Sequence, residues 1–178
     1  MRYALKPHPD SRSSAVSGIE VEVLRHRPGS LILHYFVTGR IGDLFIPPLT
    51  PPERTDGLWK HTCFEAFVRA PDAATYYELN FSPSTRWAAY KFTGYRAGMN
   101  AASEIETPHI EVQTSTGAYE MRAALILAGL ASELLWQLNL SAVIEETSGS
   151  KSYWALMHPP GKPDFHHSDC FALELATA

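Results

Sequence analysis

Carboxylate and amide side chains on two neighbouring predicted strands are the groups in this sequence whose types and spacing could do chemistry. Glu65 lies in the run Cys63 to Arg69, and Glu78 and Asn80 lie in the run Tyr76 to Ser82. Carboxylates accept several hydrogen bonds, an amide both donates and accepts, and bonds to ionised groups are the stronger ones. Gathered on one surface, these three side chains are suited to binding a small polar ligand.

An antiparallel meander of three short strands must bring these side chains together. Its strands are predicted at Cys63 to Arg69, Tyr76 to Ser82 and Arg86 to Phe92, where aromatic and β-branched runs are separated by Ala-Pro-Asp and Ser-Pro-Ser. Side chains alternate along a strand, so the apolar members of the first two runs share one face: Phe64, Ala66, Val68, Tyr77, Leu79 and Phe81. The two glutamates and the asparagine therefore share the opposite face, and Trp59 approaches it from the turn Asp56-Gly57.

Length and composition predict one globular domain spanning residues 1–178. Hydrophobic residues make up 45% of the sequence and charged residues 19%, which argues against disorder. A net charge of −4 gives no basic surface, which argues against nucleic acid as the main partner. No apolar leader follows Met1 and no apolar run has membrane-spanning length, so a cytoplasmic protein without a membrane partner is expected. Cys63 and Cys170 are expected to stay reduced there.

The rest of the chain is predicted to form further short strands separated by turns. They lie at Arg2 to Lys6, Glu20 to Arg25, Leu31 to Thr38, Ile110 to Thr114, Tyr119 to Leu127, Leu134 to Glu145, Lys151 to His158 and Cys170 to Leu175. Ile41 to Ile46 is expected to be a short extended piece, Pro47 to Pro52 to wrap the surface, and Thr93 to Thr107 to be a long loop with one helical turn at Asn100 to Glu104. About ten to eleven strands predict an all-β fold, a two-sheet antiparallel β-sandwich of jelly-roll type.

The stretch Leu134 to Glu145 alternates most regularly. Its apolar face carries Leu134, Trp136, Leu138, Leu140, Ala142 and Ile144. Gln137, Asn139 and Ser141 take the other face, and are interpreted as outer-face residues. The alternative is that these three line the same concave surface as the glutamates.

The meander and its flanks resemble a known superfamily. Trp59 stands six residues before Glu65, the segment Tyr76 to Pro83 reads Tyr-Tyr-Glu-Leu-Asn-Phe-Ser-Pro, and Arg86-Trp87 follows. This pattern resembles the DOMON-like superfamily, and in particular the branch similar to family 9 carbohydrate-binding modules. The likeness continues into the C-terminal tail and covers roughly Pro52 to Leu175.

The resemblance implies a β-sandwich that binds sugar or haem and catalyses no reaction. In family 9 modules a terminal sugar lies between two aromatic rings, while carboxylate, amide and arginine groups bond its hydroxyls. Carried onto this sequence, Trp59 is one aromatic wall, Glu65 accepts hydrogen bonds from hydroxyls and Arg86 donates them. The second wall is Trp154 or Phe165. The chemistry agrees, because an aromatic ring packs against the C–H face of a pyranose. Non-catalytic carbohydrate binding is therefore expected, with the second glutamate and the asparagine completing the site.

A haem-binding or divalent-metal-binding sandwich is the alternative. Residues of metal-ligating type gather in the last loop, although they follow no closed ligand spacing: His158, Asp164, His166, His167 and Asp169. The resemblance also implies haem ligation by a methionine and a histidine from separate strands, for which Met157 or Met121 is available.

Three further interpretations stay open. Glu65 and Glu78 on neighbouring strands fit the separation of a glycosidase carboxylate pair, although nothing in the sequence marks either one for a raised pKa. The site residues are also compatible with a structural role, with Trp59 packed in the interior, both glutamates solvated and Arg86 paired with one of them. The third is a structural or partner-binding protein whose pocket is filled. A cytoplasmic sugar binder would have to meet a sugar nucleotide, a cell-wall precursor or a short oligosaccharide.

Overall fold

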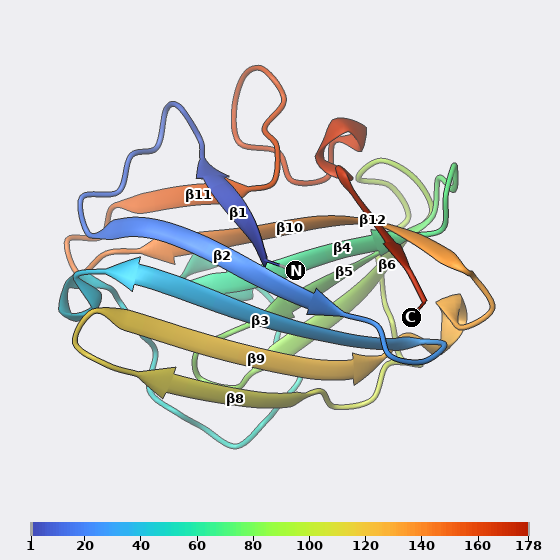
Figure 1. The fold of residues 1–178 in the computed structure, drawn as a ribbon, viewed down its shortest axis with the longest axis horizontal. Helices are drawn as coiled ribbons and strands as arrows, with labels where there is room; N and C mark the ends of the chain where they lie inside the picture. The colour runs from blue at the N-terminus through green and yellow to red at the C-terminus, as the bar shows by residue number, and fades with distance from the viewer. Residues whose placement is uncertain (1, 178) are drawn as a thin grey trace.

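The chain folds into two antiparallel β-sheets that face each other (Figure 1). This computed structural model describes residues 2–177, so both end residues of the predicted domain lie outside the description. The strands are β1 (Arg2–Pro7), β2 (Val16–Leu24), β3 (Ser30–Gly39), β4 (Cys63–Arg69), β5 (Tyr76–Phe81), β6 (Trp87–Phe92), β7 (Asn100–Ala101), β8 (His109–Thr114), β9 (Ala118–Ile126), β10 (Leu135–Glu145), β11 (Lys151–Ala155) and β12 (Leu173–Ala176). The all-β sandwich predicted from the sequence is confirmed.

Helical structure in residues 2–177 is limited to four short 3-10 turns. They are η1 (Ile41–Asp43), η2 (Leu58–Lys60), η3 (Ala128–Leu130) and η4 (Ser168–Cys170). Within the same residues, no helix has both the length and the apolar character needed to cross a membrane.

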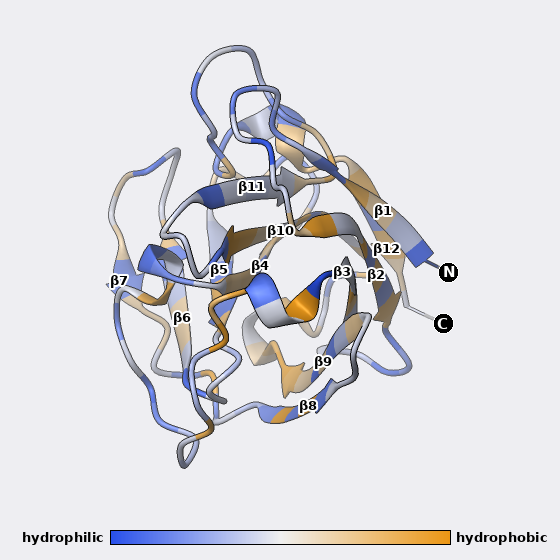
Figure 2. Ribbon diagram, turned by 90° about the vertical axis from the view of Figure 1, so that its left-hand side faces the viewer, coloured by the Kyte–Doolittle hydropathy of each residue, from blue (hydrophilic) through white to orange (hydrophobic). Residues whose placement is uncertain are grey.

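Strand β1 joins the two sheets at one edge. The first sheet has the order β1-β2-β3-β9-β8, and the second has the order β7-β6-β5-β4-β10-β11. Residues 2–5 of β1 pair with β2, whereas Lys6 and Pro7 pair with β11. β12 pairs with the first part of β10, ahead of the part that pairs with β11. Figure 2 shows β1 between β11 and β2, with the remaining strands around the interior.

Alternation along the strands places one apolar face of each sheet in a shared core. The predicted apolar faces of β4, β5 and β10 all contribute to this core, including Phe64, Leu79 and Trp136. The second sheet is also buried on its outer face, where a second apolar cluster includes Phe67 and Tyr76. Since antiparallel sheets commonly leave one face in water, this double burial indicates that other segments cover the outer face.

Three local predictions are wrong. Ile41 begins the 3-10 turn η1 instead of an extended piece, because the Leu44 N–H bonds back to the Ile41 carbonyl. The helical turn expected at Asn100 to Glu104 is not formed: Asn100 and Ala101 form strand β7, which pairs with β6, and a turn follows at Ser103 and Glu104. Leu134 is 82% exposed rather than inward-facing, because β10 begins only at the next residue.

The C-terminal strands are shorter than predicted. β11 ends at Ala155 rather than His158, and β12 begins at Leu173 rather than Cys170 because η4 occupies the residues before it. Residues 156–172, called the C-terminal loop below, contribute Phe165 and Phe171 to the outer cluster. The C-terminal loop therefore covers part of the outer face of the second sheet.

The two cysteines are buried and carry free thiols. Cys63 lies in β4, where burial and then the charges of Glu65 and Glu78 raise the pKa of its thiol well above its usual value. Burial raises the pKa of Cys170 to about 12. Both side chains therefore stay protonated at neutral pH and behave as small apolar groups.

The carboxylate of Glu146, just after β10, fixes the loop between β1 and β2. It accepts hydrogen bonds from Ser13 Oγ, Ser14 N and Ser14 Oγ at 2.8–2.9 Å, and from Ala15 N at 3.2 Å. Burial raises the pKa of Glu146, but these hydrogen bonds outweigh burial and bring the pKa down to about 2.

Glu146→Gln is expected to lower the free energy of unfolding by about 1–3 kcal/mol at pH 7, because several donors lose an ionised acceptor. The folded-state pKa lies below the unfolded value of about 4.3, so the stabilisation is complete above about pH 5 and disappears as the pH falls toward 2. Urea unfolding of both proteins at pH 7 and pH 3 measures this. A difference of equal size at the two pH values contradicts the assignment.

Candidate functional site

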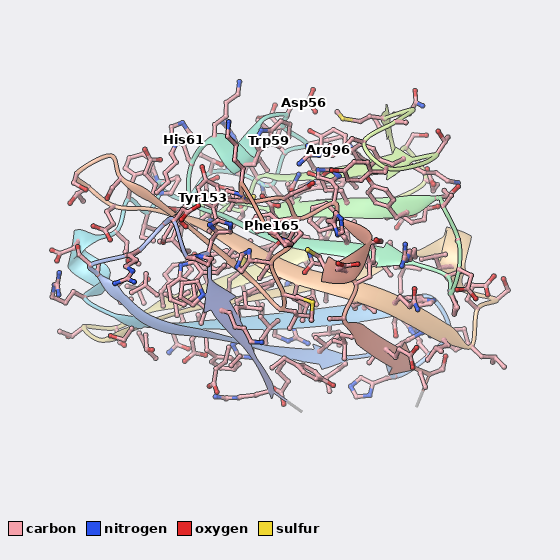
Figure 3. All side chains as sticks on the ribbon, turned by 90° about the horizontal axis from the view of Figure 1, so that it is seen from above. Asp56, Trp59, His61, Arg96, Tyr153 and Phe165 are labelled. Carbon is pink, nitrogen blue, oxygen red and sulfur yellow. The ribbon has the colours of Figure 1, made fainter. Side chains whose placement is uncertain are left out.

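A pocket of about 410 Å³ opens on the outer face of the second sheet. Its floor includes Glu65 from β4 and Glu78 from β5. Segments that cross or border the sheet supply the other lining residues: Trp59, Phe92, Arg96, Met99, Val143, Tyr153, Pro163, Phe165 and His166. Figure 3 shows Trp59, Arg96, Tyr153 and Phe165 on this side of the molecule. We call this hollow the outer pocket.

Glu65 lies at the centre of the sheet that forms the floor. It is in register with Asn80 on β5 and with Ser141 on β10, and its side chain shares their outer face. Glu65 is 3% exposed, and no residue from 2 to 177 hydrogen-bonds its Oε1 atom. Burial raises the pKa of Glu65 well above its usual value, and the nearby charge of Glu78 raises it further.

Glu78 is held in place by its neighbour on the same strand. The Asn80 Nδ2 group donates to Glu78 Oε1 at 2.8 Å. Burial raises the pKa of Glu78, and the hydrogen bond from Asn80 and the charge of Arg96 partly oppose this. Two carboxyl groups therefore lie side by side in a site where ionisation is costly.

Trp59 is presented to the outer pocket by a tight turn. Gly57 has a φ of +76°, a conformation that favours glycine, and it begins the 3-10 turn η2 that carries Trp59. The indole meets the ring of Tyr90 edge-on at 6.0 Å and remains 39% exposed. Tyr90 is fixed in turn, because its hydroxyl donates to Asp56 Oδ1 at 2.7 Å. One side of the indole is thus supported and the rest is free to contact a ligand.

The C-terminal loop closes the pocket through three anchored contacts. The Asn139 Nδ2 group donates to the backbone oxygen of Phe165 at 2.9 Å. Asp164 accepts from Arg96 Nη2 at 2.8 Å and from the hydroxyl of Tyr95. The loop between β6 and β7 is therefore tied to the C-terminal loop, and Asn139 ties that loop to the sheet.

His166 forms part of the wall next to Glu78. Its Nε2 atom lies 3.7 Å from Glu78 Oε2, and its Nδ1 atom lies 2.8 Å from the hydroxyl of Tyr76. Burial lowers the pKa of His166 and the charge of Arg96 lowers it further, against a smaller raising effect of Asp164, to about 4. The imidazole is therefore neutral at pH 7.

The His166 ring protons are expected to titrate near pH 4 in NMR spectra, with His166→Gln used to assign them. Because the unfolded pKa is about 6.5, the unfolded chain binds more protons between pH 4 and 6.5, so this residue makes stability fall as the pH is lowered through that range. His166→Gln is expected to flatten that part of the stability profile. Titration of His166 above pH 6 contradicts the buried, neutral ring.

Four of the seven residues predicted for the site line the outer pocket, and a fifth lies beneath it. Trp59, Glu65, Glu78 and Phe165 are lining residues. Asn80 is fully buried and contacts the pocket through its bond to Glu78. The parity argument that grouped the two glutamates with the asparagine agrees with this arrangement.

Arg86 and Trp154 do not line the outer pocket, which corrects the prediction for both. Arg86 precedes β6 at the turn end of the sheet, is half exposed and lies 3.6 Å from Glu53. Trp154 is opposite Ala142 in the register of β11 and β10, on the face that packs in the core. Its Nε1 donates to Ser152 Oγ at 2.9 Å, and the residue is 4% exposed.

The sequence argument missed Arg96 and Tyr153 as lining residues. Tyr153 is the neighbour of Trp154 on β11 and lies opposite Val143, which also lines the pocket. Because side chains alternate along a strand, placing Trp154 in the core would have predicted Tyr153 on the outer face. Arg96 lies in a loop with a positive φ of 51°, and no periodic pattern marks it. His166 was predicted only as a metal candidate.

The predicted metal and haem ligands do not converge. His158 Nε2 donates to the Lys6 carbonyl oxygen at 2.8 Å, Asp164 bonds Arg96, and His167 lies 3.6 Å from Asp169. Residues 2–177 hold no group of three or more histidine, cysteine, aspartate or glutamate side chains arranged to bind a metal ion. Met121 is fully buried in the core and Met157 is exposed, and neither lines the outer pocket.

Solved structures with the same fold include carbohydrate-binding proteins. A Bacteroides uniformis protein provisionally assigned as carbohydrate-binding has a TM-score of 0.68 at 12% identity, covering 100% of this chain and 86% of its own. A family 9 carbohydrate-binding module from Caldicellulosiruptor kristjanssonii, solved with glucose, has a TM-score of 0.54 at 9% identity, covering 95% of this chain and 80% of its own. A cellotriose complex of a family 9 module from the same organism has a TM-score of 0.51 at 9% identity, covering 90% and 74%.

The class that these structures define is a β-sandwich with the fold of a carbohydrate-binding module. No model of a known protein family matches the sequence, and no curated protein sequence matches it either. At 9–12% identity the likeness establishes the fold alone.

Proposed function

We propose that this protein binds a carbohydrate in the outer pocket and catalyses no reaction. The observation that carries the proposal is the position of Glu65, a buried carboxylate with an unpartnered oxygen at the floor of an open, aromatic-walled pocket. A buried polar atom without a partner is costly, so a ligand that supplies a donor gains binding energy there. The volume of about 410 Å³ lies within the usual range for small-ligand pockets.

Sugar chemistry fits the remaining walls. Trp59 and Phe165 offer apolar surface for the C–H face of a pyranose ring. Glu65 and Glu78 offer acceptors for hydroxyl groups, and Arg96 offers N–H donors. The glucose and cellotriose complexes of family 9 modules support the same ligand class, and the family 9 likeness also supports placement in the DOMON-like superfamily.

Isothermal titration with glucose, cellobiose and cellotriose tests the proposal. At least one sugar is expected to bind with a stoichiometry near one, and Glu65→Ala is expected to lower its affinity by about tenfold or more. Glu53→Ala is the matched control, because Glu53 is an exposed carboxylate that pairs with Arg86 outside the pocket. If Glu65→Ala and Glu53→Ala bind the sugar with the same affinity, the proposed site is wrong. If the protein cleaves cellotriose, the proposal that it catalyses no reaction is wrong.

A further inference from the structure

A row of buried polar atoms beneath the outer pocket lacks hydrogen-bond donors. Ser141, Glu65 and Asn80 lie directly opposite one another on three adjacent strands, β10, β4 and β5. Within residues 2–177, no partner bonds Ser141 Oγ, Glu65 Oε1 or Asn80 Oδ1, and the three residues are at most 3% exposed. The Asn80 amide oxygen can only accept hydrogen bonds, and Glu65 Oε1 only accepts them when its carboxyl group is ionised. Glu65 is the member of this row that lines the outer pocket, so its Oε1 atom is the one that a donor group of a ligand can meet.

The charges around the pocket are not balanced by the protein. Glu65 and Glu78 bring two carboxyl groups, and they occupy diagonal positions on adjacent strands, for which Cα atoms are typically about 7–8 Å apart. The Arg96 guanidinium is already paired with Asp164 at 2.8 Å. His166, 3.7 Å from Glu78, is neutral at pH 7. Burial raises the pKa of both carboxyl groups, so a cationic group from a ligand would stabilise their ionised forms, which the protein alone disfavours.

We infer that the outer pocket takes an amino sugar in its ammonium form, with the –NH₃⁺ group placed between Glu65 and Glu78. This inference rests on the proposed carbohydrate function and names the class of sugar. An ammonium group has three donors and no acceptor, which matches the unpartnered Glu65 Oε1 atom and the two carboxyl groups that line the pocket. A hydroxyl brings one donor, and an N-acetylated amine brings one donor, no charge and an additional acceptor.

Glucose, glucosamine and N-acetylglucosamine test the inference by calorimetry at pH 6.5, because they share one ring and differ at a single substituent. Glucosamine is expected to bind wild-type protein at least about tenfold more tightly than the other two sugars. In Glu65→Gln the advantage of glucosamine over glucose is expected to fall to within about threefold, because the amide keeps an acceptor but loses the charge. Glu53→Gln is expected to retain the wild-type ratio.

The outcomes separate this inference from the proposed function. Glucose bound as tightly as glucosamine overturns the amine assignment and leaves carbohydrate binding standing. Failure of all neutral and amino sugars to bind overturns both. Calcium chloride titrated alone provides a third arm, since an oxygen-rich site also suits a hard cation. Calcium binding that is lost in Glu65→Gln and that competes with glucosamine overturns the amine assignment in favour of a metal ion. If Glu65→Gln fails to fold, Glu78→Gln provides the same comparison.

Discussion

Trp154→Ala is expected to lower the free energy of unfolding by about 3–5 kcal/mol, the usual cost of emptying a large aromatic site in a core. The indole is 4% exposed and packs between the two sheets on the inner face of β11. Its truncation also leaves Ser152 Oγ without the 2.9 Å hydrogen bond from Trp154 Nε1. Urea unfolding followed by circular dichroism measures the change.

Trp59→Ala is the matched control for stability. Trp59 is 39% exposed and its ring contacts Tyr90 only edge-on, so its truncation is expected to change the free energy of unfolding by less than about 1 kcal/mol. Equal losses in the two variants would mean that Trp59 belongs to the structural core, and the proposed pocket would lose an aromatic wall.

Trp59→Ala is expected to lower the affinity for the bound sugar by about ten- to thirtyfold. A sugar that covers about 60–80 Å² of the indole gains roughly 1.5–2 kcal/mol from apolar burial at about 25 cal/mol per Å². Calorimetric titration of wild type and variant measures the ratio. Trp59→Ala therefore combines a large loss of affinity with little loss of stability, whereas the large effect expected of Trp154→Ala is on stability.

Trp59→Phe separates ring stacking from other roles of the indole. A smaller aromatic ring keeps much of the apolar surface, so the affinity of Trp59→Phe is expected to lie between those of wild type and Trp59→Ala. Unchanged affinity in both Trp59 variants would place the sugar elsewhere in the pocket. Trp154→Phe is unsuitable as a binding control, because Trp154 lies in the core.

The central part of the candidate site could be predicted because strand alternation is a local property. Glu65, Glu78 and Asn80 fall on one face whenever both runs are extended, whatever the rest of the chain does. The pairing of β4 with β5 then needed only the short Ala-Pro-Asp turn between them. The register places Glu65 opposite Asn80, as a meander of neighbouring strands requires.

The choice of aromatic walls could not be made in the same way. Alternation on β11 separates Tyr153 from Trp154, but both are aromatic, and the one that faces the core is fixed by the register with β10, in which Trp154 lies opposite Ala142. Trp154 therefore entered the core and Tyr153 the pocket. Arg86 lies beside Glu53 at the end of the sheet, and the arginine that lines the pocket is the loop residue Arg96.

The amino-acid sequence by itself determined the all-β class, the strand faces and the grouping of two carboxylates with an amide, because each follows from residue order along an extended backbone. Only the tertiary structure decided that the outer face of the second sheet is covered and hollowed. That arrangement depends on the C-terminal loop, which Asn139 and Arg96 hold over strands distant from it in the sequence. Contacts between segments far apart in the chain follow no local period, so the pocket walls became visible only in three dimensions.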